Sequence, residues 1–127
     1  MCRKVLLVDF ESILLIPLKA FLEAAGHEVT TAEDDSTALG QIQADRPDAI
    51  LYDLHFPSVG GLEFCRKVRD RPEWTEIYLV VLTSAPQDPD VQQATEIGVQ
   101  LLLPKPFPPG KLLNALQNGR ADPSPSP

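Results

Sequence analysis

Chemically reactive side chains stand at the ends of four short apolar segments of this sequence. They are Asp9 after residues 5–8, Asp53 after residues 49–52, Thr83 after residues 77–82, and Lys105 just beyond residues 100–103. Ligands of an open parallel sheet lie outside the carboxyl ends of its strands, so we expect these side chains to converge on one crevice. Two carboxylates, a hydroxyl and an ammonium group in one place are suited to handling a phosphoryl group.

The elements that must position these side chains alternate along the chain. Runs rich in Val, Ile and Leu alternate with segments of helical period, which predicts five βα units and a parallel sheet. The expected strands are residues 4–8, 28–32, 49–52, 77–82 and 100–103. The expected helices are residues 12–25, a short segment after the N-cap residues 34–36, residues 62–69, residues 91–97, and a final segment around residues 112–116.

Two of the expected helices have unusual features. Pro17 lies inside the helix at residues 12–25 and removes one backbone hydrogen bond, which predicts a kink or a later start. The helix at residues 91–97 ends at Gly98 and is only weakly amphipathic, so we expect it to be marginal. On the helix at residues 62–69, Cys65 is expected in the core. The basic residues between positions 66 and 71 are expected on a solvated face.

Length and composition restrict the class of protein. The 127 residues predict one domain, residues 1–119, followed by a Pro/Ser-rich tail, residues 120–127, that acts as a linker or disordered end. With 18 acidic against 11 basic residues, the net charge of -7 argues against direct binding to nucleic acid. No apolar stretch reaches the roughly 18 residues of a membrane span. Two cysteines without paired spacing and no recognisable leader predict a cytoplasmic protein.

Residues 5–116 resemble the receiver domain of two-component response regulators in the order and spacing of their motifs. The matching residues are Asp53, Pro57 and Gly61 in a D-x-x-x-P-x-x-x-G segment, Thr83, and the run Lys105-Pro106-Phe107. The resemblance implies a flavodoxin-like, doubly wound α/β fold with a five-stranded parallel sheet in the order 2-1-3-4-5. It also implies that Asp53 accepts a phosphoryl group from a histidine kinase or phosphotransfer protein, while Thr83 and Lys105 contact that group.

The resemblance further implies a Mg²⁺ ion bound by Asp9, Asp53 and the backbone carbonyl of His55. The family usually ends its first strand in two adjacent acids, but here Phe10 follows Asp9 and Glu11 comes next. A phenylalanine cannot bind Mg²⁺, so we expect weakened metal binding. Glu11 is either a further metal ligand or a negative charge at the start of a helix.

A second departure concerns how the domain would signal. The family places an aromatic residue three positions before the lysine, where this sequence has Leu102. Any switch must therefore use another packing change, and we expect residues 91–97 to reorganise. The expected output face consists of this segment, the strand at residues 100–103 and the final helix. The implied recipients are an effector domain or a downstream protein, and the sequence leaves self-association open.

Several alternatives remain at this stage. Asp9 alone could be a turn former, and the His55 side chain is expected to face solvent. One rival function is a degenerate receiver that binds proteins without phosphorylation because Phe10 disrupts the metal site. Another is a haloacid-dehalogenase-like phosphohydrolase, in which Asp9-Phe10-Glu11 would be the nucleophile motif, and a third is a flavodoxin-type FMN carrier. As a receiver, its chemistry would be at most Mg²⁺-dependent self-phosphorylation and autodephosphorylation.

Overall fold

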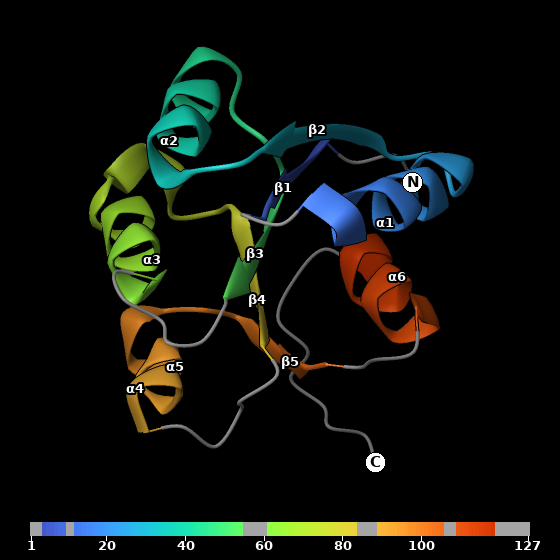
Figure 1. The fold of residues 1–127 in the computed structure, drawn as a ribbon. Coiled ribbons are helices and arrows are strands. Elements are labelled where there is room, and N and C mark those ends of the chain that lie inside the picture. Colours follow the sequence, from blue (N-terminus) through green and yellow to red (C-terminus); the bar gives the residue numbers. More distant parts are fainter. Residues whose placement is uncertain (1–3, 10–11, 55–60, 84–88, 106–108, 119–127) are drawn as a thin grey trace.

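Five parallel strands form a single sheet at the centre of the molecule (Figure 1). The computed structural model describes residues 4–9, 12–54, 61–83, 89–105 and 109–118. The strands are β1 (Lys4–Val8), β2 (Glu28–Ala32), β3 (Ala49–Leu54), β4 (Tyr78–Thr83) and β5 (Leu101–Pro104). Their order is β2-β1-β3-β4-β5, which confirms the predicted fold class and strand order. The tail predicted at residues 120–127 lies outside the described residues.

Helices cover both faces of this sheet. They are α1 (Ser12–Ala24), α2 (Asp35–Ala44), α3 (Gly61–Asp70), α4 (Pro89–Gln92), α5 (Ala94–Ile97) and α6 (Pro109–Asn118), with a 3₁₀ turn η1 at Pro72–Trp74. Figure 1 shows α1 and α6 on one face and the other helices on the opposite face. None of the helices in the described ranges is long and apolar enough to span a bilayer.

The core lies on both sides of the sheet because successive strand residues point to opposite faces. On the face covered by α2, α3 and α5, the core includes Leu6, Ile50 and Val81. On the face covered by α1 and α6, it includes Leu7 and Leu51. All six residues of β4 are buried, as expected for a strand in the interior of a parallel sheet.

Helix α1 begins at Ser12 in spite of Pro17, so the predicted later start is wrong. A proline inside a helix removes one backbone hydrogen bond. The apolar face of the helix compensates, because Leu22 is fully buried and Leu18 packs against the same core cluster. The kink predicted at Pro17 stays a prediction.

The segment predicted as one helix at residues 91–97 is two short helices, α4 and α5, which meet at Gln93. Only Ala94 is fully buried in α5, and α5 packs against α3. Gly98 ends α5 with a φ of 112°, a left-handed conformation that favours glycine. The weak apolar pattern explains why this stretch does not form one continuous helix.

Arg69 corrects the expectation that the basic residues of positions 66–71 are all solvated. Its guanidinium donates hydrogen bonds to the carbonyl oxygens of Trp74 (3.1 Å), Thr75 (3.3 Å), Ile77 (2.7 Å) and Gly98 (2.9 Å), and to Gln100 Oε1 (2.7 Å). Gln100 Oε1 also accepts a hydrogen bond from Leu79 N at 2.7 Å. Arg69 thus ties the end of α3 to the beginnings of β4 and β5. Arg66 and Lys67 are exposed, as predicted.

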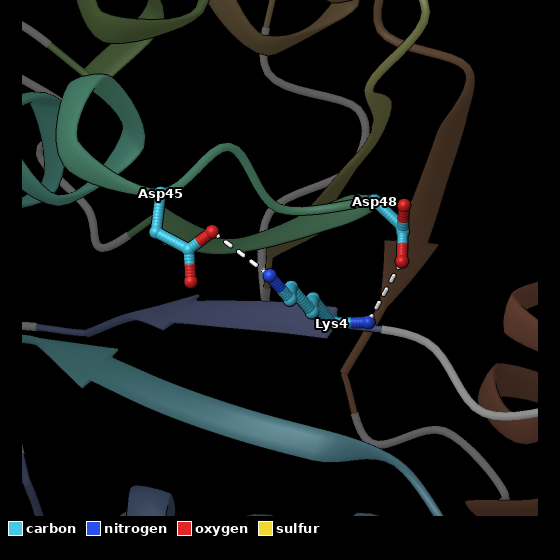
Figure 2. A network of polar contacts seen from close by, with 3 residues as sticks. All are labelled: Lys4, Asp45 and Asp48. Atoms are coloured by element: carbon cyan, nitrogen blue, oxygen red, sulfur yellow. Dashed lines mark hydrogen bonds and ion pairs between the residues drawn. The ribbon is translucent and has the colours of Figure 1, made fainter.

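The amino end of β1 is held by Lys4, as Figure 2 shows. Lys4 Nζ lies 2.8 Å from Asp45 Oδ1, and the Lys4 backbone N–H donates to Asp48 Oδ2 at 2.9 Å. The Asp48 backbone N–H in turn donates to the Lys4 carbonyl at 2.8 Å. These contacts fix β1 against the start of β3 at the end of the sheet opposite to Asp9 and Asp53.

Candidate functional site

The strand register brings the predicted site residues to one edge of the sheet. Val8 of β1 pairs with Tyr52 of β3, so Asp9 and Asp53 each lie one residue beyond the same rung. Thr83 ends β4, and its carbonyl accepts a hydrogen bond from the Lys105 N–H at 2.7 Å. The Asp9 N–H donates to the carbonyl of Ala32 at 3.0 Å. Backbone pairing therefore positions all four residues at the carboxyl edge.

Asp53 and Lys105 form an ion pair at the centre of this edge. Lys105 Nζ donates to Asp53 Oδ1 at 2.6 Å, and the two side chains are 20% and 6% exposed, respectively. A charge-assisted hydrogen bond of this length, largely removed from water, fixes both side chains. The ammonium group is therefore placed directly against the carboxylate that the sequence predicts to be the nucleophile.

The electrostatics of Asp53 reflect its confined position. Burial raises the pKa of the Asp53 carboxyl above its ordinary value, and the hydrogen bond from Lys105 opposes that rise. The negative charge of Asp9 raises the pKa of Asp53 further. Two neighbouring carboxylates face one ammonium group, so an added cation would favour the ionised form of Asp53.

This donor set fits a Mg²⁺ ion. Asp9, Asp53 and Thr83 are buried, with 2%, 4% and 2% of their surface exposed. Mg²⁺ is commonly bound by one or two protein carboxylates together with water and phosphate oxygens, and Asp9 and Asp53 supply two such carboxylates. Within the described ranges, no group of three or more His, Cys, Asp or Glu side chains could hold a metal. The other predicted ligands, Glu11 and the His55 carbonyl, lie outside the described residues, and so does Phe10, which is expected to weaken metal binding.

Leu102 lies where the family usually has an aromatic residue. It pairs with Val81 in the sheet and is partly buried against the core cluster that contains Ala94 of α5. This position links β5 to the short helix that was predicted to reorganise.

Sequence reasoning missed a second polar contact beside the site. Tyr52 directly precedes Asp53, and its hydroxyl donates to Asp35 Oδ1 at 2.9 Å. The sequence predicts N-cap residues at positions 34–36, and in the structure the N-cap is Asp34, which accepts from the Thr37 N–H at 2.7 Å. A tyrosine in an apolar run could have indicated such a contact, because a buried tyrosine hydroxyl usually requires a hydrogen-bond partner.

The chain belongs to the response regulator receiver domain family, whose model matches residues 5–117. It is 32% identical over 109 residues to the alkaline phosphatase synthesis transcriptional regulatory protein PhoP of Bacillus subtilis, covering 86% of this chain and 45% of PhoP. It is 37% identical over 107 residues to the response regulator PleD of Caulobacter vibrioides, covering 84% of this chain and 24% of PleD. The chain thus spans half or less of the length of these curated relatives.

Solved receiver structures agree with this assignment. The chemotaxis response regulator CheY4 of Vibrio cholerae superposes with a TM-score of 0.79 at 34% identity, covering 93% of this chain and 98% of that chain. The receiver domain of the sensor histidine kinase PA1611 of Pseudomonas aeruginosa gives a TM-score of 0.81 at 26% identity, covering 94% of this chain and 98% of that chain. That structure has a magnesium ion coordinated in its active site cleft. These findings confirm the predicted family and favour the receiver interpretation over a phosphohydrolase or an FMN carrier.

Proposed function

We propose that this receiver domain accepts a phosphoryl group on Asp53 and thereby changes its contacts with other proteins. The observation that supports this most directly is the 2.6 Å contact between the buried Asp53 carboxylate and the Lys105 ammonium group. Asp9 and Thr83 lie at the same edge of the sheet. A nucleophile, a cation and a hydroxyl donor are thus available to one phosphoryl group.

The transfer begins with attack of an Asp53 carboxylate oxygen on phosphorus. The new P–O bond gives an acyl phosphate, while the bond from phosphorus to the donor's leaving atom breaks and that atom keeps the electron pair. Lys105 neutralises negative charge on the phosphoryl oxygens, and the hydroxyl of Thr83 donates a hydrogen bond to one of them. Asp9 and Asp53 would hold a magnesium ion, which would supply further positive charge for this transfer.

We infer a cytoplasmic phosphoryl donor of the histidine kinase or phosphotransfer type and an output through an effector domain or a downstream protein. The family assignment supports this inference. The output face that we propose consists of α4, α5, β5 and α6, because α4 and α5 are short and Leu102 connects β5 to the core beneath them.

A second candidate function is binding of other proteins without phosphorylation. It is favoured by Phe10, which occupies the place of the family's usual second acid between Asp9 and Glu11. With one metal ligand missing, Mg²⁺ would bind weakly and Asp53 would rarely be phosphorylated.

Acetyl phosphate distinguishes these functions. The full chain is incubated with acetyl phosphate and Mg²⁺, and its intact mass is measured over time. We expect one added phosphoryl group, which Asp53→Asn abolishes, with acetate as the leaving group. Asp45→Asn is the matched control, because it removes an exposed carboxylate at the opposite end of the sheet. An unmodified mass at millimolar Mg²⁺ would reject phosphorylation and favour the second function.

A further inference from the structure

Tyr52 is held on two sides at the position directly before Asp53. Its ring stacks on Phe64 of α3, with the ring centroids 4.8 Å apart and an angle of 13° between the planes. Its hydroxyl donates to Asp35 Oδ1, in the first turn of α2, at 2.9 Å. The tyrosine is 1% exposed. The Tyr52 side chain thus connects β3 to α2, which precedes it in sequence, and to α3, which follows it.

The hydrogen bond between Tyr52 and Asp35 is suited to a permanent contact. Burial raises the pKa of the Tyr52 hydroxyl above its ordinary range, and the negative charge of Asp35 adds to this, so the hydroxyl stays a donor. A charge-assisted hydrogen bond is stronger than one between neutral groups, and this one is partly buried. Together with the stacked rings, it restricts Tyr52 to one position.

The position of Tyr52 determines that of Asp53. Adjacent strand residues point to opposite faces, so Tyr52 reaches toward α2 and α3 without entering the site. Its backbone pairs with Val8, the residue before Asp9. A shift of Tyr52 would therefore move the Asp53 carboxylate relative to the Lys105 ammonium group, which lies 2.6 Å away.

We propose that Tyr52, held by Asp35 and Phe64, is a positioning residue for phosphoryl transfer to Asp53. The inference rests on the proposed function of Asp53. Attack on phosphorus requires an aligned nucleophile, and a displacement of about 1 Å can cost on the order of a hundredfold in rate. Loss of the hydroxyl contact removes no reacting group, but it lets β3 and its Asp53 occupy a wider range of positions, so the aligned arrangement is less populated.

A double-mutant cycle tests this inference. The variants are Tyr52→Phe, Asp35→Ala and their combination, and acetyl phosphate at saturating Mg²⁺ gives the maximal rate and the apparent KM for each. We expect each single variant to lower the maximal rate about threefold to tenfold with little change in KM. The double variant should lose no more than the worse single variant, because both remove the same hydrogen bond.

Two comparisons separate positioning from a general loss of stability. Asp35→Asn keeps an oxygen that accepts from Tyr52 and should retain a rate close to that of the unaltered protein. Tyr78→Phe removes a hydroxyl from the other fully buried tyrosine, at the opposite end of the sheet, and should leave the rate unchanged. Urea unfolding of every variant shows whether rate and stability change together. If Asp35→Ala does not fold, Tyr52→Phe against Tyr78→Phe decides the question.

The outcomes distinguish this inference from the proposed function. No phosphoryl group on the unaltered protein would reject both. Normal phosphorylation of that protein with unchanged rates in Tyr52→Phe would overturn the positioning role alone. Additive losses in the double variant, or equal losses in Tyr52→Phe and Tyr78→Phe, would also overturn it.

Discussion

At the residue scale, the site holds more negative charge than its one lysine neutralises. In the folded protein, burial and the charge of Asp9 raise the pKa of Asp53 above its ordinary value of 3.8, against the opposing hydrogen bond from Lys105. The folded protein therefore binds that proton more tightly than the unfolded chain does. This tighter proton binding stabilises the folded protein most below the ordinary pKa of Asp53, and the stabilisation is lost as the pH rises through the folded-state pKa. The proposed phosphoryl transfer thus uses a charge arrangement that costs stability at neutral pH.

Asp9→Asn should stabilise the metal-free protein at neutral pH while impairing phosphorylation. The amide removes the negative charge beside Asp53, and each pKa unit by which Asp53 falls adds about 1.4 kcal/mol to the free energy of unfolding. Urea unfolding with a chelator present measures this, and the gain should shrink as the pH falls below the ordinary pKa of 3.8, where Asp53 becomes protonated in both states. Asp45→Asn, in an exposed ion pair that water screens, should instead leave the free energy of unfolding nearly unchanged. A destabilised Asp9→Asn at pH 7 would contradict this account.

At the element scale, Arg69 connects segments that the sheet alone does not fix. Its guanidinium bonds to carbonyl oxygens after η1 and α5 and to the Gln100 side chain. Gly98 is part of the same contact, because a Cβ built on it would lie 3.2 Å from Arg69 Cδ. A planar, multi-donor group is needed to bind several oxygens at once. Arg69 therefore adds polar contacts to the apolar packing of α5 against α3.

Arg69→Ala should lower the free energy of unfolding by about 2–4 kcal/mol, because several partly buried carbonyl oxygens lose their donor. Arg69→Lys should recover little of this, since an ammonium group cannot reproduce the fork of the guanidinium. Chemical denaturation measures both variants. Arg66→Ala is the control on the same helix, and at this exposed position the change should stay within about 0.5 kcal/mol. Similar losses at the two arginines would show that Arg69 has no special role.

At the scale of the whole molecule, the sequence predicted the features that depend on the local pattern of apolar and polar residues. The apolar runs gave every strand to within two residues, and the parallel order placed Asp9, Asp53, Thr83 and Lys105 at one edge. It did not predict contacts that depend on the packing of distant segments. Arg69 was expected on a solvated face and the hydrogen bond of Tyr52 was not predicted, because their partners Gly98 and Asp35 are far away in sequence.

These distant contacts suggest which part of the proposed output face is free to change when Asp53 is phosphorylated. Arg69 holds the end of α5 through Gly98, and α5 packs against α3. Helix α4 lies beside α5, and the helical stretch is interrupted at Gln93. We therefore expect the change to be concentrated at residues 89–93, while residues 97–100 keep their contacts.

Amide hydrogen exchange on the phosphorylated protein, with Asp53→Asn as the reference that cannot be phosphorylated, tests this division. Exchange at residues 89–93 should change by about fivefold or more, which corresponds to about 1 kcal/mol of local stability. Exchange at residues 97–100 should stay within about twofold of the reference, because the Arg69 contacts persist. In Arg69→Ala, phosphorylation should alter exchange across the whole of residues 89–100, since the end of α5 is no longer held. Equal changes in both segments of the unaltered protein would mean that α4 and α5 move as one unit and that Arg69 does not limit the response.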